Sequence, residues 1–177
     1  GKVLAYRLDI LADAGAYPRL GAVLPSFTCR MAPGVYDIPK VRSHARAVVT
    51  TTTSTAAYRG AGRPEATAAI ERAMDLFAAE IGMDPAEVRK RNVIPPEAFP
   101  FRTATGLVYD SGDYAAAIDK VLDAAGYREL RVEQARRRER DDVVQLGIGL
   151  SAFVEITGGG AFAEDATVEV HPDGTVT

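Results

Sequence analysis

The sequence predicts an α+β fold in which mixed or antiparallel strands are segregated from helices along the chain. Strand-like residues occupy the beginning, helical periodicity occupies the middle, and strand-like residues return at the end. The regular β-α-β alternation of a doubly wound parallel sheet is not visible. We therefore expect strands and a loop in residues 1–63, a helical part in 64–142, and strands of a following sheet in 143–177.

The composition is that of an ordinary globular chain. Of 177 residues, 47% are hydrophobic and 25% are charged, and the formal net charge is -3. Such a chain gives no reason to expect nucleic acid or an anionic membrane surface as partner. Cys29 is the only cysteine, which excludes an internal disulfide and a multi-cysteine metal site and suits the cytoplasm. No apolar run approaches the roughly 20 residues of a membrane span.

The first part contains two predicted strands. Residues 2–12 alternate in polarity and should form the first strand, with a turn of small residues at 13–18. Residues 19–35 have no clean period and should be irregular with one short helical piece. Residues 45–53 are rich in β-branched side chains and should form the second strand. His44 beside it is predicted to be a surface residue, because a metal site needs several converging ligands.

A glycine-containing loop, residues 58–62, follows the second strand; we call it the glycine loop. Gly60 and Gly62 lack a Cβ, so the backbone can turn sharply and another group can approach it closely. Arg59 and Arg63 add cationic donors, and the amides at the start of the next helix suit anionic or oxo groups. A tight strand-to-helix turn with two solvated arginines is an equally open alternative.

Four helices are predicted after the loop. The first covers residues 64–81, where apolar side chains recur at helical spacing before Gly82. Its apolar stripe consists of Ala66, Ile70, Ala73, Met74, Phe77 and Ile81. A short second helix follows Asp84 as N-cap, with Pro85 at its first position. Its charged residues are expected to face solvent: Glu87, Arg89, Lys90 and Arg91.

A connector that contains Pro95, Pro96 and Pro100 should lie extended against something larger. Residues 110–113 start a third helix that ends at Gly126. Residues 127–142 mix arginines with glutamates, which predicts a solvent-facing helix. A nucleic-acid-binding arm is the weaker alternative, because glutamates interrupt the basic residues and no aromatic side chains are interleaved with the arginines after Tyr127.

The last part should return to a sheet over residues 143–156, with Gly147 and Gly149 leaving room for a backbone or ligand. Residues 157–160 should be a flexible loop, either a plain linker or an amide contact to a phosphate. Residues 168–177 are typical of a hairpin that uses Gly174. Because both ends fall within strands, we expect a piece of a longer protein, with exposed apolar surface and a tendency to self-associate.

Six stretches carry a family resemblance through their order and spacing. They are Asp-Ala-Gly-Ala-Tyr-Pro (13–18), Tyr-Asp-Ile-Pro (36–39), Tyr-Arg-Gly-Ala-Gly-Arg (58–63), Asp-Pro-Ala-Glu-Val-Arg-Lys-Arg-Asn (84–92), Gly-Ile-Gly (147–149) and Glu-Ile-Thr-Gly (155–158). Together they resemble the large subunit of the molybdenum hydroxylases, the family of xanthine dehydrogenase, aldehyde oxidase and aerobic carbon monoxide dehydrogenase. The likeness is to the carbon-monoxide-dehydrogenase-like branch, and it implies an internal piece of the molybdopterin-binding region.

The resemblance implies a molybdenum enzyme that hydroxylates an aldehyde or an N-heterocycle with water. The implied cofactor is molybdopterin cytosine dinucleotide with molybdenum, and the implied partners are an FAD-binding medium subunit and a small subunit with 2Fe-2S clusters. The implied cofactor neighbours are Tyr58, Arg59, Gly60, Ala61 and Gly62, and the implied edges of the substrate pocket are Ala57 and Ala61. The family's catalytic glutamate belongs to a segment further downstream, so the isolated chain should be inactive, and Glu65, Glu155 and Glu164 should not replace it. A non-catalytic structural or interaction domain that keeps the fold is the alternative.

Two loop positions depart from relatives with defined substrates. Aerobic carbon monoxide dehydrogenases place a cysteine after the loop arginine to hold copper, and this chain has Gly60 there. Xanthine-hydroxylating relatives place an aromatic ring where this chain has Ala61. We therefore expect no copper, negligible carbon monoxide oxidation and no efficient purine turnover.

Overall fold

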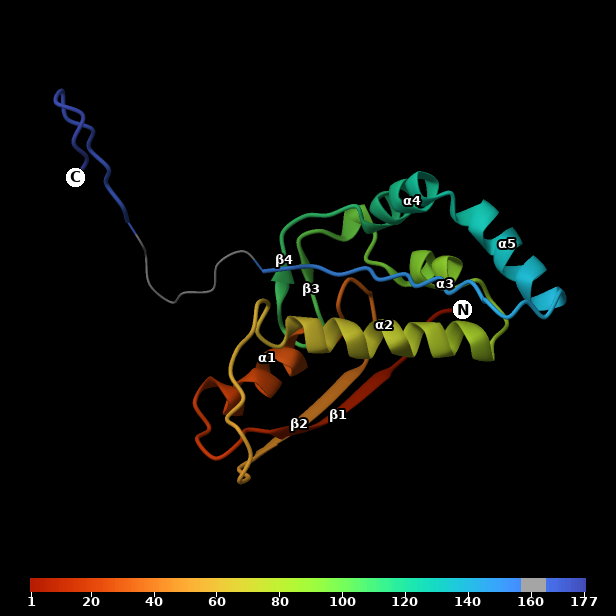
Figure 1. The fold of residues 1–177 in the computed structure, drawn as a ribbon, viewed down its shortest axis with the longest axis horizontal. Coiled ribbons are helices and arrows are strands. Elements are labelled where there is room, and N and C mark those ends of the chain that lie inside the picture. Colours follow the sequence, from red (N-terminus) through yellow and green to blue (C-terminus); the bar gives the residue numbers. More distant parts are fainter. Residues whose placement is uncertain (157–164) are drawn as a thin grey trace.

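The computed structural model describes residues 1–156 and 165–177, and it stacks helices on one side of a two-stranded sheet (Figure 1). The elements are β1 (Tyr6–Asp13), η1 (Leu20–Ala22), α1 (Leu24–Met31), β2 (Val41–Val48), α2 (Arg63–Glu80), α3 (Pro85–Asn92), η2 (Pro96–Ala98), β3 (Phe101–Arg102), β4 (Val108–Tyr109), α4 (Tyr114–Ala125) and α5 (Tyr127–Glu139). Helices α1 and α2 lie next to the sheet, and α3, α4 and α5 form a further layer beyond them (Figure 1). The predicted α+β class is confirmed.

The second strand of the main sheet lies earlier in the chain than predicted. Strands β1 and β2 are parallel, paired from Tyr6 with Val41 to Asp13 with Val48, and α1 provides the crossover between them. The second strand therefore lies at Val41–Val48, not at 45–53. The Asp13 carboxylate accepts hydrogen bonds from the hydroxyls of Thr50 and Thr52, at 2.7 and 2.8 Å, which turns the chain out of the ladder after β2.

Helix α2 confirms the prediction within one residue at each end. Gly82 takes a left-handed φ of 63° after it, and the amide of Met83 donates to the carbonyl of Ala78 at 2.9 Å. These are the features of a Schellman cap. Helix α3 begins as expected, because the Asp84 carboxylate accepts from the amide of Ala86 at 2.8 Å and Pro85 needs no partner for its nitrogen.

The expectation that the charged residues of α3 all face solvent is wrong for Arg89. Its side chain is fully buried, and its Nε donates to Glu71 of α2 at 2.8 Å. Helix α3 turns the face containing Val88 and Asn92 toward the core, and Arg89 shares that face. Burial is tolerated because α2 supplies the opposite charge, a partner that local spacing within α3 does not reveal.

The helices after the connector follow local signals, whereas the connector itself holds an unpredicted hairpin. Strands β3 and β4 pair antiparallel, Phe101 with Tyr109. Helix α4 is capped by the Asp113 carboxylate, which accepts from the amide of Ala116 at 3.0 Å. Helix α5 is solvent-facing as predicted; Gln134 is its buried residue.

Residues 143–156 do not form the predicted strand. The segment runs extended and its side chains alternate between exposed and half-buried, but it forms no ladder with a described strand. Its polar groups instead meet helices: the Gln134 side chain donates to Leu146 O at 2.9 Å, and Arg89 donates to Leu150 O at 2.9 Å. No atom lies within 4 Å of a Cβ built on Gly147 or Gly149, so the expected close approach is also not seen among the described residues.

The C-terminal hairpin is confirmed by an antiparallel bridge between Val170 and Val176 and by Gly174 with φ 84°. The predicted flexible loop at 157–160 lies outside the described residues.

One hydrophobic core joins the helices to the segment between α1 and β2. It consists of Val35, Tyr36, Ile38, Ile70, Met74, Ala78, Val88, Val93 and Ile118. Asn92 ties the start of the chain to this core, because its side chain donates to Gly1 O at 2.8 Å and accepts from the amide of Val3 at 2.8 Å. Apolar side chains such as Leu76 and Val121 stay more than half exposed, in line with the expected apolar surface.

Candidate functional site

The glycine loop is built from three successive residues with left-handed backbone. Gly60, Ala61 and Gly62 have φ values of 93°, 42° and 89°. The turn is closed by the amide of Ala61 donating to Tyr58 O at 2.8 Å and by the amide of Arg63 donating to Gly60 O at 3.1 Å. A positive φ is uncommon for alanine, so the surrounding packing must hold Ala61 in place.

Packing within the chain requires glycine at both loop positions. A Cβ on Gly62 would lie 2.7 Å from Leu24 O and 2.9 Å from Phe27 Cβ, both on α1. A Cβ on Gly60 would lie 2.7 Å from Cδ of Pro64. The loop is therefore fixed between α1 and the start of α2, and the tight-turn interpretation accounts for the two glycines.

The turn after β1 positions the segment that leads into the loop. Asp13 accepts from Thr50, Thr52 and the amide of Gly15, and these hydrogen bonds lower the pKa of the Asp13 carboxyl, Thr50 contributing most. The amide of Tyr17 donates to the Ser54 hydroxyl at 3.1 Å. The motif at 13–18 thus supports residues 50–54, a role that the sequence did not reveal.

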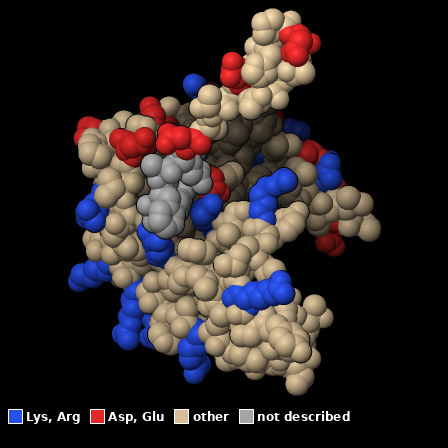
Figure 2. Space-filling view, turned by 90° about the vertical axis from the view of Figure 1, so that its left-hand side faces the viewer, with Lys and Arg blue, Asp and Glu red and all other residues tan. Residues whose placement is uncertain are grey.

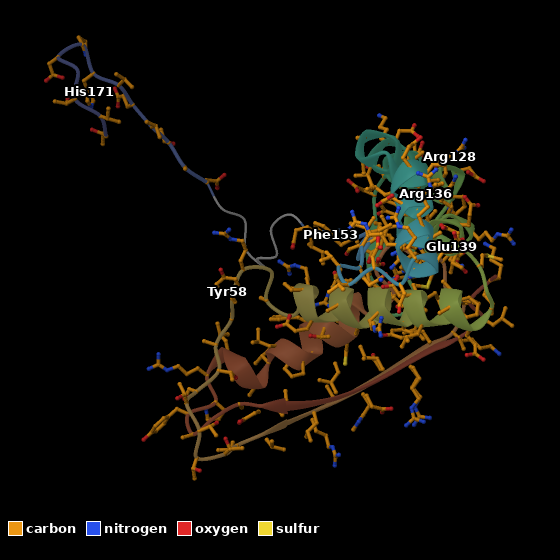
Figure 3. All side chains as sticks on the ribbon, turned by 45° about the vertical axis from the view of Figure 1, so that its right-hand side comes forward. Tyr58, Arg128, Arg136, Glu139, Phe153 and His171 are labelled. Carbon is orange, nitrogen blue, oxygen red and sulfur yellow. The ribbon has the colours of Figure 1, made fainter. Side chains whose placement is uncertain are left out.

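Other polar groups of the loop have no partner among the described residues, and the side chains of Tyr58 and Arg59 are exposed. Tyr58 is 85% exposed and extends from the loop at the start of α2 (Figure 3). Arg59 is exposed and forms no ion pair with a described residue. The amides of Gly60, which is half-buried, and of Gly62, which is buried against α1, donate to no described residue either. Amides and a guanidinium are donors that suit an oxygen-rich or anionic group, so these residues fit the pterin–molybdenum cofactor that the resemblance implies.

The other predicted site residues are close in the chain but differ in environment. Ala57 is exposed and Ala61 is half-buried. Arg63 is the first residue of α2 and forms an ion pair with Glu155 of the extended segment. On the face of the molecule that contains this end of α2, basic side chains are scattered over the lower half and acidic ones gather toward the top (Figure 2).

The sequence analysis missed a buried polar cluster at the middle of α2. Glu71 accepts from the Tyr36 hydroxyl, from Arg89 Nε at 2.8 Å and from the amide of Ala152 at 3.0 Å. Burial raises the pKa of Tyr36, and the neighbouring Glu71 carboxylate raises it further. Burial alone would lower the pKa of Arg89, but its hydrogen bond and charge contact with Glu71 raise it. The sequence contained one signal of this cluster: Glu71 is a charged residue next to Ile70 on the apolar side of the predicted helix.

The histidine and acidic side chains do not form a second candidate site among the described residues. Within residues 1–156 and 165–177, no three His, Cys, Asp or Glu side chains meet as a metal site. His44 is exposed on β2, as predicted, and His171 contacts Thr177 within the hairpin at 2.8 Å. Glu65 is exposed, and Glu164 lies outside the described residues. Among the described helices, none is long and apolar enough to span a bilayer.

Comparison with known proteins gives a family match. The family model of the molybdopterin cofactor-binding domain matches residues 1–93. The carbon monoxide dehydrogenase large chain of Hydrogenophaga pseudoflava is 36% identical over 190 residues, which cover 99% of this chain and 24% of that protein. The chain thus spans about a quarter of the length of this curated relative.

Solved structures show the same fold. Reconstituted carbon monoxide dehydrogenase from Oligotropha carboxidovorans superposes with a TM-score of 0.71 at 37% identity, over 80% of this chain and 18% of that one. Quinoline 2-oxidoreductase from Pseudomonas putida 86 gives 0.69 at 32% identity, over 77% and 18%. The family match covers more than half of the chain and includes β1, β2, the glycine loop, α2 and α3. The chain therefore belongs to the molybdopterin cofactor-binding domain family and is part of a large subunit of the molybdenum hydroxylase type.

Proposed function

We propose that the glycine loop holds the molybdopterin cofactor, in its cytosine dinucleotide form, beside the substrate of a molybdenum hydroxylase. Arg59 and the amides of Gly60 and Gly62 provide the hydrogen bonds, and Tyr58 borders the group. Ala57 and Ala61 form the edge of the substrate pocket. When bound, the cofactor supplies oxygen transfer to carbon and accepts two electrons; the loop binds and orients it.

The observation that carries this proposal is the backbone of the loop. Left-handed φ values at Gly60, Ala61 and Gly62 use the amides of Ala61 and Arg63 internally and leave those of Gly60 and Gly62 without a described acceptor. Packing against α1 fixes the donors before any ligand arrives. A preformed set of donors binds an oxygen-rich ligand without an ordering cost.

The proposed substrate of the whole protein is an aldehyde or a small N-heterocycle. Ala61 offers no ring face for stacking a purine, and Gly60 offers no thiolate for copper. Cys29 is half-buried on α1 and is not part of the loop. Quinoline 2-oxidoreductase, by its name, acts on an N-heterocycle and shares this fold. We further propose a cytoplasmic complex with an FAD-binding medium subunit and a 2Fe-2S small subunit, which would carry the electrons away.

The test uses the complete protein purified with its partner subunits from cells supplied with molybdate. We expect molybdenum and a cytosine-containing pterin near one per large subunit, dye reduction with aldehydes or N-heterocycles, and no copper. Arg59→Ala should lower the retained molybdenum, whereas Arg46→Ala on β2 should not. Complete protein that contains no molybdenum, or that holds copper and oxidises carbon monoxide, would contradict the proposal.

The same proposal predicts that the 177-residue chain alone is inactive and retains no cofactor. The physical reason is that one loop supplies only part of the contacts that a large dinucleotide cofactor needs. Metal analysis of the purified chain measures this directly, and near-stoichiometric molybdenum would overturn the expectation.

A further inference from the structure

The extended segment 143–156 contacts α2 at two separate places. At the middle of the helix, the amide of Ala152 donates to Glu71 Oε2 at 3.0 Å, and beside it Leu150 O accepts from Arg89 of α3 at 2.9 Å. At the start of the helix, Glu155 forms an ion pair with Arg63. In Figure 1 the segment passes along α2 and runs toward its N-terminal end, where the glycine loop lies.

The distance between the two contacts along α2 can be compared with the length of the extended segment that joins them. From Arg63 to Glu71 the helix rises about 12 Å, at about 1.5 Å per residue. From Ala152 to Glu155 an extended chain covers about 10 Å, at about 3.3 Å per residue. The two lengths agree within the reach of the side chains, so a segment bound at Glu71 places Glu155 next to Arg63. Phe153, between the two contacts, lies on this segment above α2 (Figure 3).

The two contacts differ in strength. The Arg89 and Glu71 side chains are 0% and 7% exposed, whereas those of Arg63 and Glu155 are 27% and 47% exposed. The segment binds this buried pair through the amide of Ala152 and the carbonyl of Leu150, and this contact acts as the anchor because leaving buried polar groups unsatisfied is costly. The half-exposed pair of Arg63 and Glu155 is weaker. It is directly connected to the loop, because the amide of Arg63 donates to Gly60 O at 3.1 Å.

We propose that Glu155 is a positioning residue: through Arg63 it holds the glycine loop in its ligand-ready conformation, and the anchor at Glu71 holds Glu155. This inference rests on the proposed function, because it assigns the loop a ligand to be held ready for. It adds a residue from a distant part of the chain to the site. Neither Arg63 nor Glu155 needs to touch the cofactor or the substrate for this role.

Hydrogen exchange of the complete protein, read on peptides that cover residues 56–62, tests the positioning role. In Glu155→Gln we expect the loop amides to exchange roughly two- to fivefold faster, as the loss of a half-exposed ion pair implies. Peptides from α3 should be unchanged. The charge-reversed double variant Arg63→Glu/Glu155→Arg should restore the slow exchange, since an acidic residue is also favourable at a helix start.

A matched control is Asp119→Asn, which removes an ion pair with Lys90 of similar exposure, 31% and 53%, away from the loop. It should leave loop exchange unchanged. Unaltered exchange in Glu155→Gln, or an equal effect of Asp119→Asn, would overturn the positioning role. Molybdenum content of the same samples separates the two proposals. A wild-type protein without molybdenum refutes the cofactor assignment, while faster loop exchange in Glu155→Gln and its rescue would still establish the positioning contact.

Discussion

Arg59 and Arg89 lie in two regions of the molecule that treat the same side chain in opposite ways. Arg89 is fully buried, and its guanidinium donates to Glu71, Asp75 and the carbonyls of Pro85 and Leu150. Arg59 is exposed and pairs with no described residue. The buried arginine holds helices together, whereas the exposed one has its donors free for another molecule. Whether an arginine stabilises the fold or is available for a ligand thus depends on where its partners lie.

Substitution of Arg89 should have the largest effect on stability. Arg89→Met leaves the buried Glu71 carboxylate without its counter-charge, so we expect the free energy of unfolding to fall by about 3–5 kcal/mol. Arg91→Met, on the exposed side of α3, should change it by less than about 0.5 kcal/mol. Urea unfolding followed by circular dichroism measures both. Equal losses in the two variants would mean that the buried cluster does not stabilise the fold.

Gly62→Ala should have the next largest effect, and Gly106→Ala is its control. Both glycines have a similar left-handed φ, 89° and 91°. Added methyl groups cost about 1–2 kcal/mol for backbone conformation alone. Only at Gly62 would the methyl group meet α1, at 2.7 Å from Leu24 O, which adds roughly 1–3 kcal/mol of overpacking. If both variants unfold at the same urea concentration, the loop is not fixed by α1.

Asp13 should make the stability of the region before the glycine loop depend on pH. Hydrogen bonds from Thr50, the Gly15 amide and Thr52 lower the pKa of the Asp13 carboxyl below its ordinary value of 3.8. Its contribution to stability is therefore present above that ordinary value and is lost as the pH falls through the lower folded value. Wild type should exceed Asp13→Asn in stability at neutral pH, and the difference should vanish in strong acid. Asp37→Asn, at an exposed position, is the control; a difference that persists unchanged at low pH would contradict the assignment.

Arg59→Ala should have the smallest effect on folding, within about 0.5 kcal/mol of wild type. The effect should be small because Arg59, unlike Arg89, is exposed and has no described partner, so its removal breaks no contact. Thermal unfolding of the 177-residue chain checks it. A loss of more than about 1 kcal/mol would show that Arg59 has a structural role after all.

Local signals predicted the helices well. Gly82 ended α2, Asp84 began α3, and Asp113 began α4, because each cap uses residues within one turn of the helix. Non-local partners explain the errors. Strand β2 was misplaced because β1 sets its register, and Arg89 was placed on the surface because Glu71 lies on another helix.

The candidate site divides in the same way. The glycine loop could be found from sequence because its residues are contiguous and its glycines mark a special backbone. Its supports could not: Asp13 reaches Thr52 across 39 residues, and Arg63 meets Glu155. Nothing in the local pattern around Asp13 or Glu155 specifies those partners.

The contact between Arg89 and Leu150 bears on the order of events during synthesis. The two residues are 61 positions apart, and the family match ends at residue 93. At about 5–20 residues per second, Leu150 is made roughly 3–12 s after Arg89. During that interval the guanidinium lacks one of its acceptors and the Glu71 carboxylate lacks the amide of Ala152. A nascent chain that ends between residues 93 and 150 should therefore lack the contacts of the later segment at Arg89 and Glu71, and a protease should cut between α2 and α3 faster than in the chain that includes this segment.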